Sequence, residues 1–494
     1  MQHVILGAGP AGVIAAETIR KNAPYDQILV IGDEPEAPYS RMAIPYLLIG
    51  NVGEEGTHLR HGAGHFAALR ISIRLARCTA VDVVRRTITL SEGSIIPFDT
   101  LLIATGSSPA TPPIPGIQGP GVHTCWTLAD ARAIMALATP GARVLQMGAG
   151  FIGCIIMEAL AARGVQLSVV EMGDRMVPRM MGPTAGGMIK DWCQAKGVAV
   201  YTGARVEAID RQSAAAAITP ATPAATAPAA PRPSMRPVVK PELSLLQKLG
   251  NLVGLAHVPA PPPPAPWPSA AAPAVAAPVP ATAAPAAPML VRLSTGQVLP
   301  ADLVISATGV KPNIGFLQDS GITCLLGVLT DEHLQTSVPG VYAAGDCAEA
   351  FDKISGTTIV SAIQPNAAEQ ARVAALNMVG KVTSLKGVTQ INVLDTLGLI
   401  SASFGNWQGV AGGEQVELAN PAAGKLLSLQ FSGNTLVGCN AVGWTDHVGV
   451  MRGLVEGQVV LSDDWTQRLM ADPTLLMEAY LANAQAQQEV AHVR

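Results

Sequence analysis

The residues best suited to chemistry in this sequence are the glycines of two short turns, "ILGAGPAG" and "QMGAGFIG". In a G-x-G-x-x-G pattern, the first glycine permits a tight turn, the second lets a pyrophosphate approach the backbone, and the third lets a helix pack on a strand. Each turn therefore predicts a site for one dinucleotide. The glycines concerned are Gly7, Gly9 and Gly12 in the first turn, and Gly148, Gly150 and Gly153 in the second.

Each turn needs a strand before it and a helix after it, because the N-terminus of a helix offers unpaired N–H groups and partial positive charge to phosphate. The apolar run from His3 to Leu6 predicts the strand before the first turn. After the second turn we expect a helix over Cys154 to Ala162, which Gly164 can terminate.

A second strand follows each helix and ends at an acidic residue. "QILVI" leads to Asp33 and Glu34, and "VQLSVVE" ends at Glu171. A carboxylate at this position accepts hydrogen bonds from a ribose diol and repels a 2′-phosphate. Glu171 therefore favours NADH over NADPH in the second site, although Arg175 lies nearby.

Two dinucleotide sites on one chain indicate a relay between two redox cofactors. We expect one of them to be a mobile nicotinamide and the other a tightly held flavin that accepts its hydride.

Three more segments carry a family resemblance: "TLLIATGSSP", "ADLVISATGVKPN" and "TSVPGVYAAGDCAE". With both turns in this order, the chain resembles the FAD-dependent pyridine nucleotide reductases. Within them it looks most like the branch of NADH oxidases, rubredoxin and ferredoxin reductases, and the flavin module of nitrite reductase.

This resemblance implies an α/β fold with two Rossmann-like dinucleotide-binding domains, one for FAD and one for NADH, plus a small α+β C-terminal dimerisation domain. The implied parts are an FAD-binding domain over residues 1–112 and 329–384, an NAD-binding domain over 113–212 and 289–328, an Ala/Pro-rich insertion over 213–288, and a C-terminal interface domain over 385–494.

The family's binding roles carry over where residues match. The first glycine turn would hold the FAD pyrophosphate, Glu34 the adenosine ribose, and Asp346 the ribityl or pyrophosphate portion. Arg41 would lie beside the FAD, and Val81 would meet adenine through its backbone. The matching positions are, for FAD, Gly7, Gly9, Gly12, Glu34, Arg41, Val81, Thr105, Gly106 and Asp346, and, for NADH, Gly148, Gly150, Gly153, Glu171 and Gly309.

The segment "SAIQPNAAEQARVAALNMVG" predicts a helix, because Pro365 suits a first helical turn and the apolar residues after it recur at helical spacing. The resemblance implies that its N-terminus points at the flavin. An ordinary packing helix is the alternative.

Two departures from the family bear on the chemistry. Met42 stands where disulfide-handling relatives carry a redox cysteine, and a thioether forms neither a thiolate nor a mixed disulfide. Ile155 stands where many relatives have a glutamate near the nicotinamide, while Phe151 still supplies an aromatic ring. We therefore expect the flavin to do the chemistry, with no catalytic protein residue, and electrons to leave it without help from sulfur.

The insertion, residues 213–288, has the Ala- and Pro-rich composition of an extended, disordered linker. It would replace a hairpin turn of the NAD-binding domain. Within it, residues 241–256 carry an apolar stripe at helical spacing. We expect that segment to be a docking peptide for a partner, a chance apolar island, or a helix that lies back on its own domain.

The C-terminal part reads as alternating strands with a turn at Asn434, followed by a helix in "HVGVMRGLVEG". The tail "QRLMADPTLLMEAYLANAQAQ" predicts one terminal amphipathic helix. Trp444 and His447 in "GWTDH" are unusual residues, for which a structural or interface role is favoured over one near the flavin. We expect this part to form a homodimer interface.

Charge, apolar runs and cysteine spacing argue against nucleic-acid binding, a membrane span and a metal site. The net charge of −4 gives no reason to expect nucleic-acid binding. No run of apolar residues in the sequence is long enough to cross a bilayer, and we expect no signal peptide before the first motif. The seven cysteines are scattered without a CxxC pair, which predicts no metal site and fits a reducing cytoplasm.

These observations predict an FAD-dependent NADH oxidoreductase. NADH would pass a hydride to FAD, and electrons would move on to a protein redox carrier such as a rubredoxin, a ferredoxin or an iron–sulfur partner. Direct reduction of oxygen is the first alternative. A flavin-containing interaction protein whose partner binding responds to NADH is the second.

Overall fold

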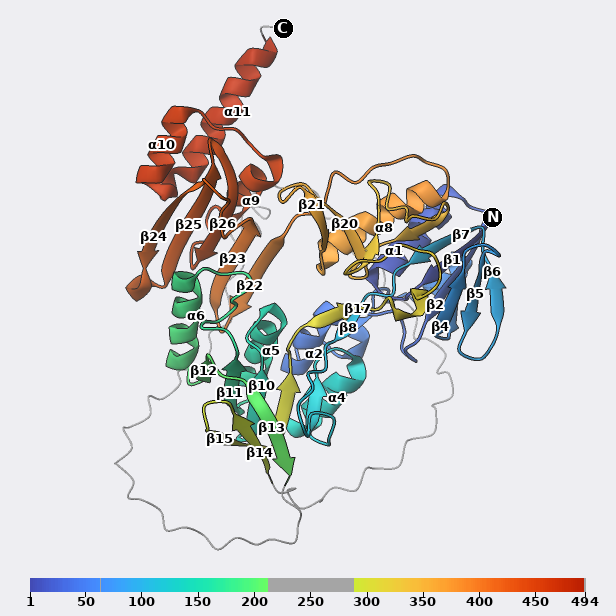
Figure 1. Ribbon diagram of the computed structural model, residues 1–494, viewed down its shortest axis with the longest axis horizontal. Coiled ribbons are helices and arrows are strands. Elements are labelled where there is room, and N and C mark those ends of the chain that lie inside the picture. The colour runs from blue at the N-terminus through green and yellow to red at the C-terminus, as the bar shows by residue number, and fades with distance from the viewer. Residues whose placement is uncertain (63, 212–287, 493–494) are drawn as a thin grey trace, which may run out of the picture. The chain divides into compact units, whose positions relative to one another are not determined.

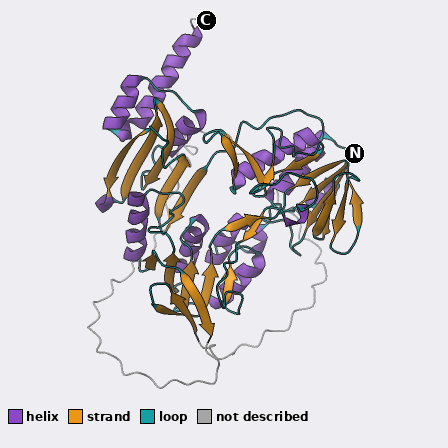
Figure 2. Cartoon of the chain, in the orientation of Figure 1, coloured by secondary structure: helices purple, strands orange, loops and turns teal. Residues whose placement is uncertain are grey.

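Three five-stranded sheets organise the residues that the computed structural model describes, which are 1–62, 64–211 and 288–492 (Figure 1). Two of these sheets are parallel and alternate with helices, and the third is antiparallel (Figure 2). The predicted docking segment 241–256 lies outside the described residues.

The first parallel sheet is built from short, buried apolar strands, which is typical of a sheet covered on both faces. Its order is β19-β7-β1-β2-β3. Helices α1 (Pro10–Asn22) and α8 (Gln364–Met378) lie together on one face. The strands are β1 (Gln2–Leu6), β2 (Gln27–Gly32), β3 (Ile71–Leu75), β7 (Thr100–Ile103) and β19 (Val341–Ala343).

The opposite face of this sheet packs against a small antiparallel sheet. Strand β1 contributes to the cores on both faces, because its alternate residues point to opposite faces. Val4 and Leu6 join the core shared with that small sheet, whereas Ile5 joins the core under α1 and α8. The small sheet contains β4 (Cys78–Asp82), β5 (Thr87–Leu90) and β6 (Ile95–Pro97). Nearby elements are α3 (His65–Ala68), β18 (Val328–Leu329), β20 (Ala348–Asp352) and β21 (Thr357–Val360). Helix α2 (Ile44–Ile49) packs instead in the core of the second parallel sheet.

The second parallel sheet repeats this three-layer plan in the order β12-β11-β10-β16-β9. One face carries the helices α4 (Leu128–Leu137), α5 (Phe151–Ala162) and α6 (Pro183–Ala195). The sheet contains β9 (Val122–Thr124), β10 (Arg143–Met147), β11 (Gln166–Glu171), β12 (Ala199–Thr202) and β16 (Leu303–Ser306). The other face is covered by β13 (Val206–Arg211), β14 (Met289–Leu293) and β15 (Val298–Ala301).

Two connections matter for the site. The predicted crossovers at Thr105 and Thr308 lead into β8 (Ser107–Pro109) and β17 (Val310–Pro312), which pair with each other in an antiparallel ribbon. Strands β13 and β14 also pair directly, with Arg211 opposite Met289. The two ends of the insertion therefore meet at one hairpin position, as expected for a segment that replaces a turn.

The antiparallel sheet has the order β22-β23-β26-β25-β24 and packs against the C-terminal helices. Its strands are β22 (Ile391–Thr396), β23 (Leu399–Gly405), β24 (Glu414–Asn420), β25 (Lys425–Ser432) and β26 (Thr435–Val442). The helices are α9 (Val448–Gly457), α10 (Asp463–Ala471) and α11 (Leu476–His492).

Two predicted helices differ from those observed. The helix after the second turn begins at Phe151 rather than Cys154, because Gly150 has the extended conformation of an N-cap. The tail forms α10 and α11 rather than one helix, because Pro473 follows the end of α10 and opens a short 3₁₀ turn. No described helix is both long and apolar enough to cross a lipid bilayer.

Candidate active site

Both glycine turns have the shape that a pyrophosphate site requires. A side chain on Gly7 would fall on the Ala104 carbonyl, and one on Gly12 would fall on the Gly7 carbonyl. In contrast, a Cβ on Gly9 would meet no atom within 4 Å, so the middle of the turn is open. The first turn therefore leaves room for a ligand where the motif predicts it.

The second turn repeats this geometry. Gly148 has φ +94°, and a side chain there would collide with the Ala307 carbonyl. A Cβ on Gly153 would collide with the Gly148 carbonyl, whereas one on Gly150 would meet nothing within 4 Å. The residues of both turns thus fit dinucleotides, with the helices α1 and α5 starting directly behind them.

One cavity of about 250 Å³ joins the first turn to the start of α5. The predicted residues Gly7, Gly9, Glu34, Arg41, Thr105, Gly106 and Asp346 line it. Phe151, Ile152 and Ile155 line the same cavity from the N-terminal end of α5. The first turn and the start of the helix behind the second turn therefore share one cavity. The positions predicted for NADH, which are Gly148, Gly150, Gly153, Glu171 and Gly309, do not line it.

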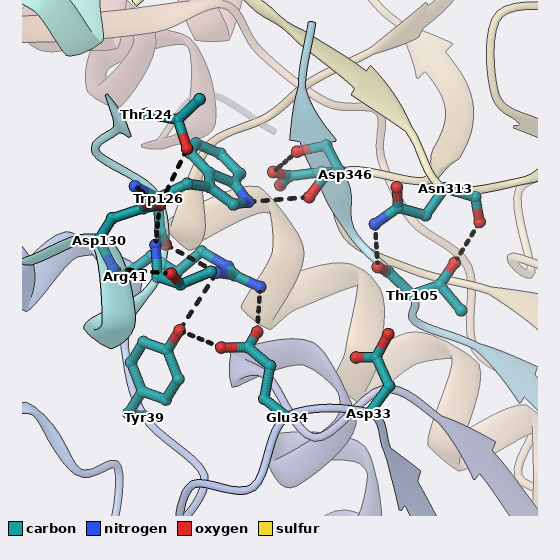
Figure 3. A network of polar contacts seen from close by, with 12 residues as sticks. Asp33, Glu34, Tyr39, Arg41, Thr105, Thr124, Trp126, Asp130, Asn313 and Asp346 are labelled. Carbon is teal, nitrogen blue, oxygen red and sulfur yellow. Dashed lines mark hydrogen bonds and ion pairs between the residues drawn. The ribbon is translucent and has the colours of Figure 1, made fainter. Parts of the chain in front are cut away.

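A polar network crosses the wall of this cavity (Figure 3). The Arg41 guanidinium donates to Glu34 Oε1 at 2.6 Å and to the Trp126 carbonyl at 2.7 Å. It also lies over two aromatic rings, 5.7 Å from the centroid of Tyr39 and 5.3 Å from that of Trp126. Arg41 is thus held as a cation between two π faces.

Tyr39 is the second hydrogen-bond donor to the Glu34 carboxylate. Its hydroxyl donates to Glu34 Oε2 at 2.6 Å, so both carboxylate oxygens have a donor. Burial raises the pKa of Tyr39, and the neighbouring carboxylate raises it further, so the phenol keeps its proton. A carboxylate oxygen has a second lone pair, which leaves Glu34 able to accept from a ribose hydroxyl.

Asp346 occupies the other end of the network. Ser107 Oγ donates to its Oδ2 at 2.8 Å, and Trp126 Nε1 donates to the Ser107 carbonyl at 3.0 Å. Burial raises the pKa of Asp346, and the Ser107 hydrogen bond opposes that rise. Thr105 is fixed to the second crossover, because its hydroxyl donates to the Asn313 carbonyl and its own carbonyl accepts from the Asn313 amide.

The start of α8 also lies at this cavity, which Gln364 and Ala367 line. Pro365 stands in the first turn of the helix, as predicted. The N-terminal N–H groups of a helix of 15 residues carry partial positive charge toward the space.

At the second turn, Glu171 is bound to backbone amides on either side. Its Oε2 accepts from Ala149 N at 2.7 Å and its Oε1 from Gly173 N at 2.8 Å. Gly309 has φ +113° at the second crossover. Arg175 donates to Asp174 and to the carbonyls of Met181 and Pro178. All three donor nitrogens of that guanidinium therefore have partners within the loop.

Of the positions predicted to bind FAD, Gly12 and Val81 do not line the cavity. Val81 is buried in the core between the first parallel sheet and the small sheet, where it pairs with Ile88, and it does not line the cavity. Asp33, the alternative ribose acceptor, lines the cavity and forms an ion pair with Arg77 at 2.7 Å.

Sulfur near the cavity comes from Met42 and Cys125. Burial raises the pKa of Cys125 to about 12, so its thiol stays protonated at neutral pH. No group of three or more His, Cys, Asp or Glu side chains within the described ranges is arranged to hold a metal ion.

Sequence reasoning missed four residues at the site: Tyr39, Ser107, Cys125 and Trp126. Ser107 stands inside the motif "TLLIATGSSP", and Tyr39 lies two residues before the predicted Arg41. Cys125 and Trp126 lie in the loop between β9 and α4, and no motif marks them. Trp444, by contrast, packs on the C-terminal core, with the Lys425 ammonium over its ring.

Comparison with known proteins identifies the family. The model of the pyridine nucleotide-disulphide oxidoreductases matches residues 1–224 and 280–375. The NADH-dependent phenylglyoxylate dehydrogenase subunit epsilon of Aromatoleum evansii is 27% identical over 458 residues, covering 92% of this chain and 91% of that protein. An NADH oxidase of Methanocaldococcus jannaschii is 27% identical over 391 residues, covering 77% of this chain and 70% of the other.

The fold also matches solved structures. The covalent complex of putidaredoxin reductase with putidaredoxin superposes with a TM-score of 0.77 at 20% identity, covering 98% of this chain and 99% of that one. This likeness confirms the predicted α/β fold class. The family match confirms the prediction of an oxidoreductase that uses FAD and a pyridine nucleotide. The chain belongs to the pyridine nucleotide-disulphide oxidoreductase family.

Proposed function

We propose that this protein transfers electrons from NADH through FAD to a protein redox carrier. The observation that carries this proposal is the single cavity lined both by the first glycine turn and by the start of α5, the helix behind the second turn. FAD, when bound, supplies a hydride acceptor that can release electrons one at a time to a partner.

The residues at the first turn are suited to hold FAD. The open backbone at Gly9 and the N-terminus of α1 would receive the pyrophosphate, with the Arg41 cation adding positive charge. Glu34 would accept from the adenosine ribose, and Asp346 from hydroxyls of the ribityl chain. Val81 remains a predicted backbone contact for adenine. Thr105 and Gly106 remain predicted FAD-binding positions at the crossover.

The residues at the second turn favour NADH over NADPH. Glu171 places negative charge at the end of β11, where a 2′-phosphate would be repelled. Arg175 does not offset that charge, because its donor nitrogens bind Asp174 and two loop carbonyls. Gly150 is open to a pyrophosphate, and Gly309 would line the same site.

Electron release without a thiol supports a protein acceptor rather than a disulfide substrate. Met42 lines the cavity where the family's redox cysteine would stand, and Cys125 is held protonated by burial. Relatives consistent with a protein acceptor include the dehydrogenase subunit of A. evansii, which by its name works within a larger enzyme.

The test uses the purified, FAD-containing protein under argon. We expect NADH to bleach the flavin absorbance rapidly and NADPH to do so slowly. Mixing the reduced protein with oxidised rubredoxin, ferredoxin or a co-purified iron–sulfur partner should restore the absorbance faster than mixing with air. A flavin that NADH never bleaches would refute the proposal.

Direct oxygen reduction is the second candidate, because a relative that matches most of this chain is named an NADH oxidase. It predicts fast NADH consumption in air that no added carrier accelerates. An NADH-responsive interaction protein predicts slow turnover with every acceptor, together with partner binding through residues 241–256 that changes with NADH.

We further propose that the protein is a cytoplasmic homodimer joined through residues 385–494. The isolated, free cysteines fit a reducing compartment. Sedimentation of the full chain and of a variant with charges placed on the antiparallel sheet would test the dimer.

A further inference from the structure

The two glycine turns have the same spacing but are fastened differently. Each anchors its first glycine to the neighbouring strand, through Gly7 N to the Ile31 carbonyl at 2.7 Å and Gly148 N to the Val170 carbonyl at 2.8 Å. In the first turn, this is the only backbone hydrogen bond that Gly7 and Ala8 make within the described residues. Within the described residues, the Gly7 carbonyl and both backbone groups of Ala8 have no protein hydrogen-bond partner.

In the second turn, both peptide groups that follow the anchor are held. Gln146 Nε2 donates to the Gly148 carbonyl at 2.9 Å. The Ala149 N–H donates to Glu171 Oε2 at 2.7 Å, and the Ala149 carbonyl accepts from Val177 N at 2.9 Å. The second turn is therefore fixed in the protein before any ligand arrives.

Gln146 is the residue whose hydrogen bond to the second turn was not expected from the sequence. It precedes its turn by the same interval as Ile5 precedes the first, and both side chains lie under the third glycine. Ile5 Cγ2 is 3.3 Å from where a Cβ on Gly12 would sit, and Gln146 Nε2 is 2.8 Å from the corresponding point on Gly153. The same place in the fold thus accepts an apolar side chain.

An amide in this place is costly. Gln146 is fully buried, and its register partners on the neighbouring strands, Val169 and Ile305, belong to the apolar core. Its Oε1 is buried without a hydrogen-bond partner in the described residues. Burial of an unsatisfied polar atom is unfavourable, so packing alone does not account for glutamine here.

We propose that Gln146 is a positioning residue that orders the NADH turn in advance of binding. This rests on the proposed function, in which FAD stays bound while NADH arrives and leaves in every cycle. A turn that must be ordered at each encounter lowers affinity, and a preorganised one avoids that loss. The first turn, which would hold FAD permanently, does not need to be ordered before each binding event. This agrees with the few protein hydrogen bonds that it makes.

The test replaces the amide with the residue of the first turn, Gln146→Ile, in the full-length FAD-containing protein, with Gln146→Met as a second, unbranched variant. ADP-ribose, which carries the pyrophosphate without the nicotinamide, is the probe. We expect its dissociation constant, measured by calorimetry, to rise about fivefold to tenfold, the factor that one ordinary hydrogen bond is worth.

Three further readouts separate positioning from a merely structural role. Amide hydrogen exchange at Gly148 and Ala149 should accelerate in the ligand-free protein, the FAD content should stay unchanged, and the thermal midpoint should not fall. Cys193→Ala is the matched control, because Cys193 is buried in the same core on α6 and makes none of the turn's hydrogen bonds. It should lower the midpoint without changing ADP-ribose affinity.

The inference is overturned if both variants bind ADP-ribose within twofold of the parent, or if exchange at the turn is unchanged. It is also overturned if Cys193→Ala weakens binding as much as Gln146→Ile does. Failure of the parent itself to bind ADP-ribose or NADH would instead contradict the proposed NADH site, and hydrogen exchange would still report on the turn.

Discussion

At the scale of single residues, the chain has the family's cofactor turns without the family's reactive sulfur. Burial raises the pKa of Cys78 to about 11, and of Cys125 and Cys193 to about 12. The remaining four thiols have a raised pKa for the same reason; they are Cys154, Cys324, Cys347 and Cys439. A thiol must ionise to act as a nucleophile, so all seven are poorly placed for redox chemistry.

Thiol reagents should therefore leave electron transfer intact. At pH 7 a thiol with a pKa of about 11 is ionised in on the order of one molecule in ten thousand. Iodoacetamide treatment, followed by anaerobic reduction with NADH, should give the untreated rate. Met42→Ala should also keep NADH-dependent bleaching, because the thioether takes no part. Rapid inactivation that NADH protects against would contradict this prediction.

The turn geometry of the motif glycines could be predicted from the sequence, because it is local. Gly7 and Gly148 were predicted because a turn's backbone geometry depends on a few adjacent residues. Sequence reasoning did not find Tyr39 and Trp126, which act because the fold brings a loop before α4 beside the segment after β2. Gln146 could not be predicted as a site residue, because no sequence motif marks a single polar residue in a buried strand.

At the scale of elements, both nucleotide domains use one plan, a parallel sheet with helices on one face and a small antiparallel sheet on the other. Alternate buried residues along β1 join the cores on the two faces of the sheet. The sequence predicted such strands as short apolar runs, but it did not predict the antiparallel layer. Two predicted helix boundaries were wrong, because residues at the helix ends set where each helix begins or stops. Gly150 starts α5 early, and Asp472 with Pro473 ends α10 in the tail.

An ion pair between the first residue of β10 and the residue before β16 gives a pH-dependent prediction. Arg143 donates from its side chain and its backbone to Asp302, and these hydrogen bonds lower the pKa of Asp302. A lowered folded-state pKa stabilises the fold above the carboxylate's ordinary pKa of about 3.9, and that stabilisation is lost as the pH falls through the folded value.

Asp302→Asn should therefore lower the free energy of unfolding at pH 7 by about 1 kcal/mol, a modest figure because both side chains are partly exposed. The difference from the parent protein should shrink in denaturation experiments carried out below pH 4. Asp210→Asn, which breaks a more exposed pair with Arg292, is the control and should have a smaller effect. A difference that is constant with pH would show that the pair contributes nothing.

At the scale of the whole molecule, one buried amide links the antiparallel sheet to the second nucleotide domain. Asn440 on β26 donates to the Met180 carbonyl at 2.9 Å, and its Oδ1 accepts from Gly182 N at 2.9 Å. Asn440 is 2% exposed. Gly182 is the N-cap of α6, so the amide closes the start of that helix from a different domain.

Asn440→Leu should lower the free energy of unfolding by about 2–3 kcal/mol, because it leaves two backbone groups without partners in a buried place. Urea denaturation followed by Trp fluorescence and by flavin release should then show two separated transitions in place of one. Asn420→Ala, at an exposed cap, should cost under about 1 kcal/mol. A single, unshifted transition in Asn440→Leu would contradict this coupling.

The hairpin of β13 and β14 allows the insertion to be removed cleanly. Arg211 and Met289 are paired neighbours, so a short turn can replace residues 213–286. Shortening the loop should raise the free energy of unfolding by about 2 kcal/mol, through the lower entropy cost of closing it. NADH-dependent bleaching should be unchanged. Slower bleaching in the shortened protein would mean that the insertion takes part in electron transfer.

The position of Trp126 has a practical consequence. Its indole lines the cavity, and its N–H is fixed to the Ser107 carbonyl, so its orientation is set before a cofactor enters. Indole emission overlaps flavin absorption, and an isoalloxazine in that space would quench it. The chain contains six tryptophans, and Trp126→Phe would isolate the share of the emission that belongs to this one. Tryptophan emission of the purified protein should therefore fall as the cavity fills with flavin, and this measures cofactor occupancy without an added label.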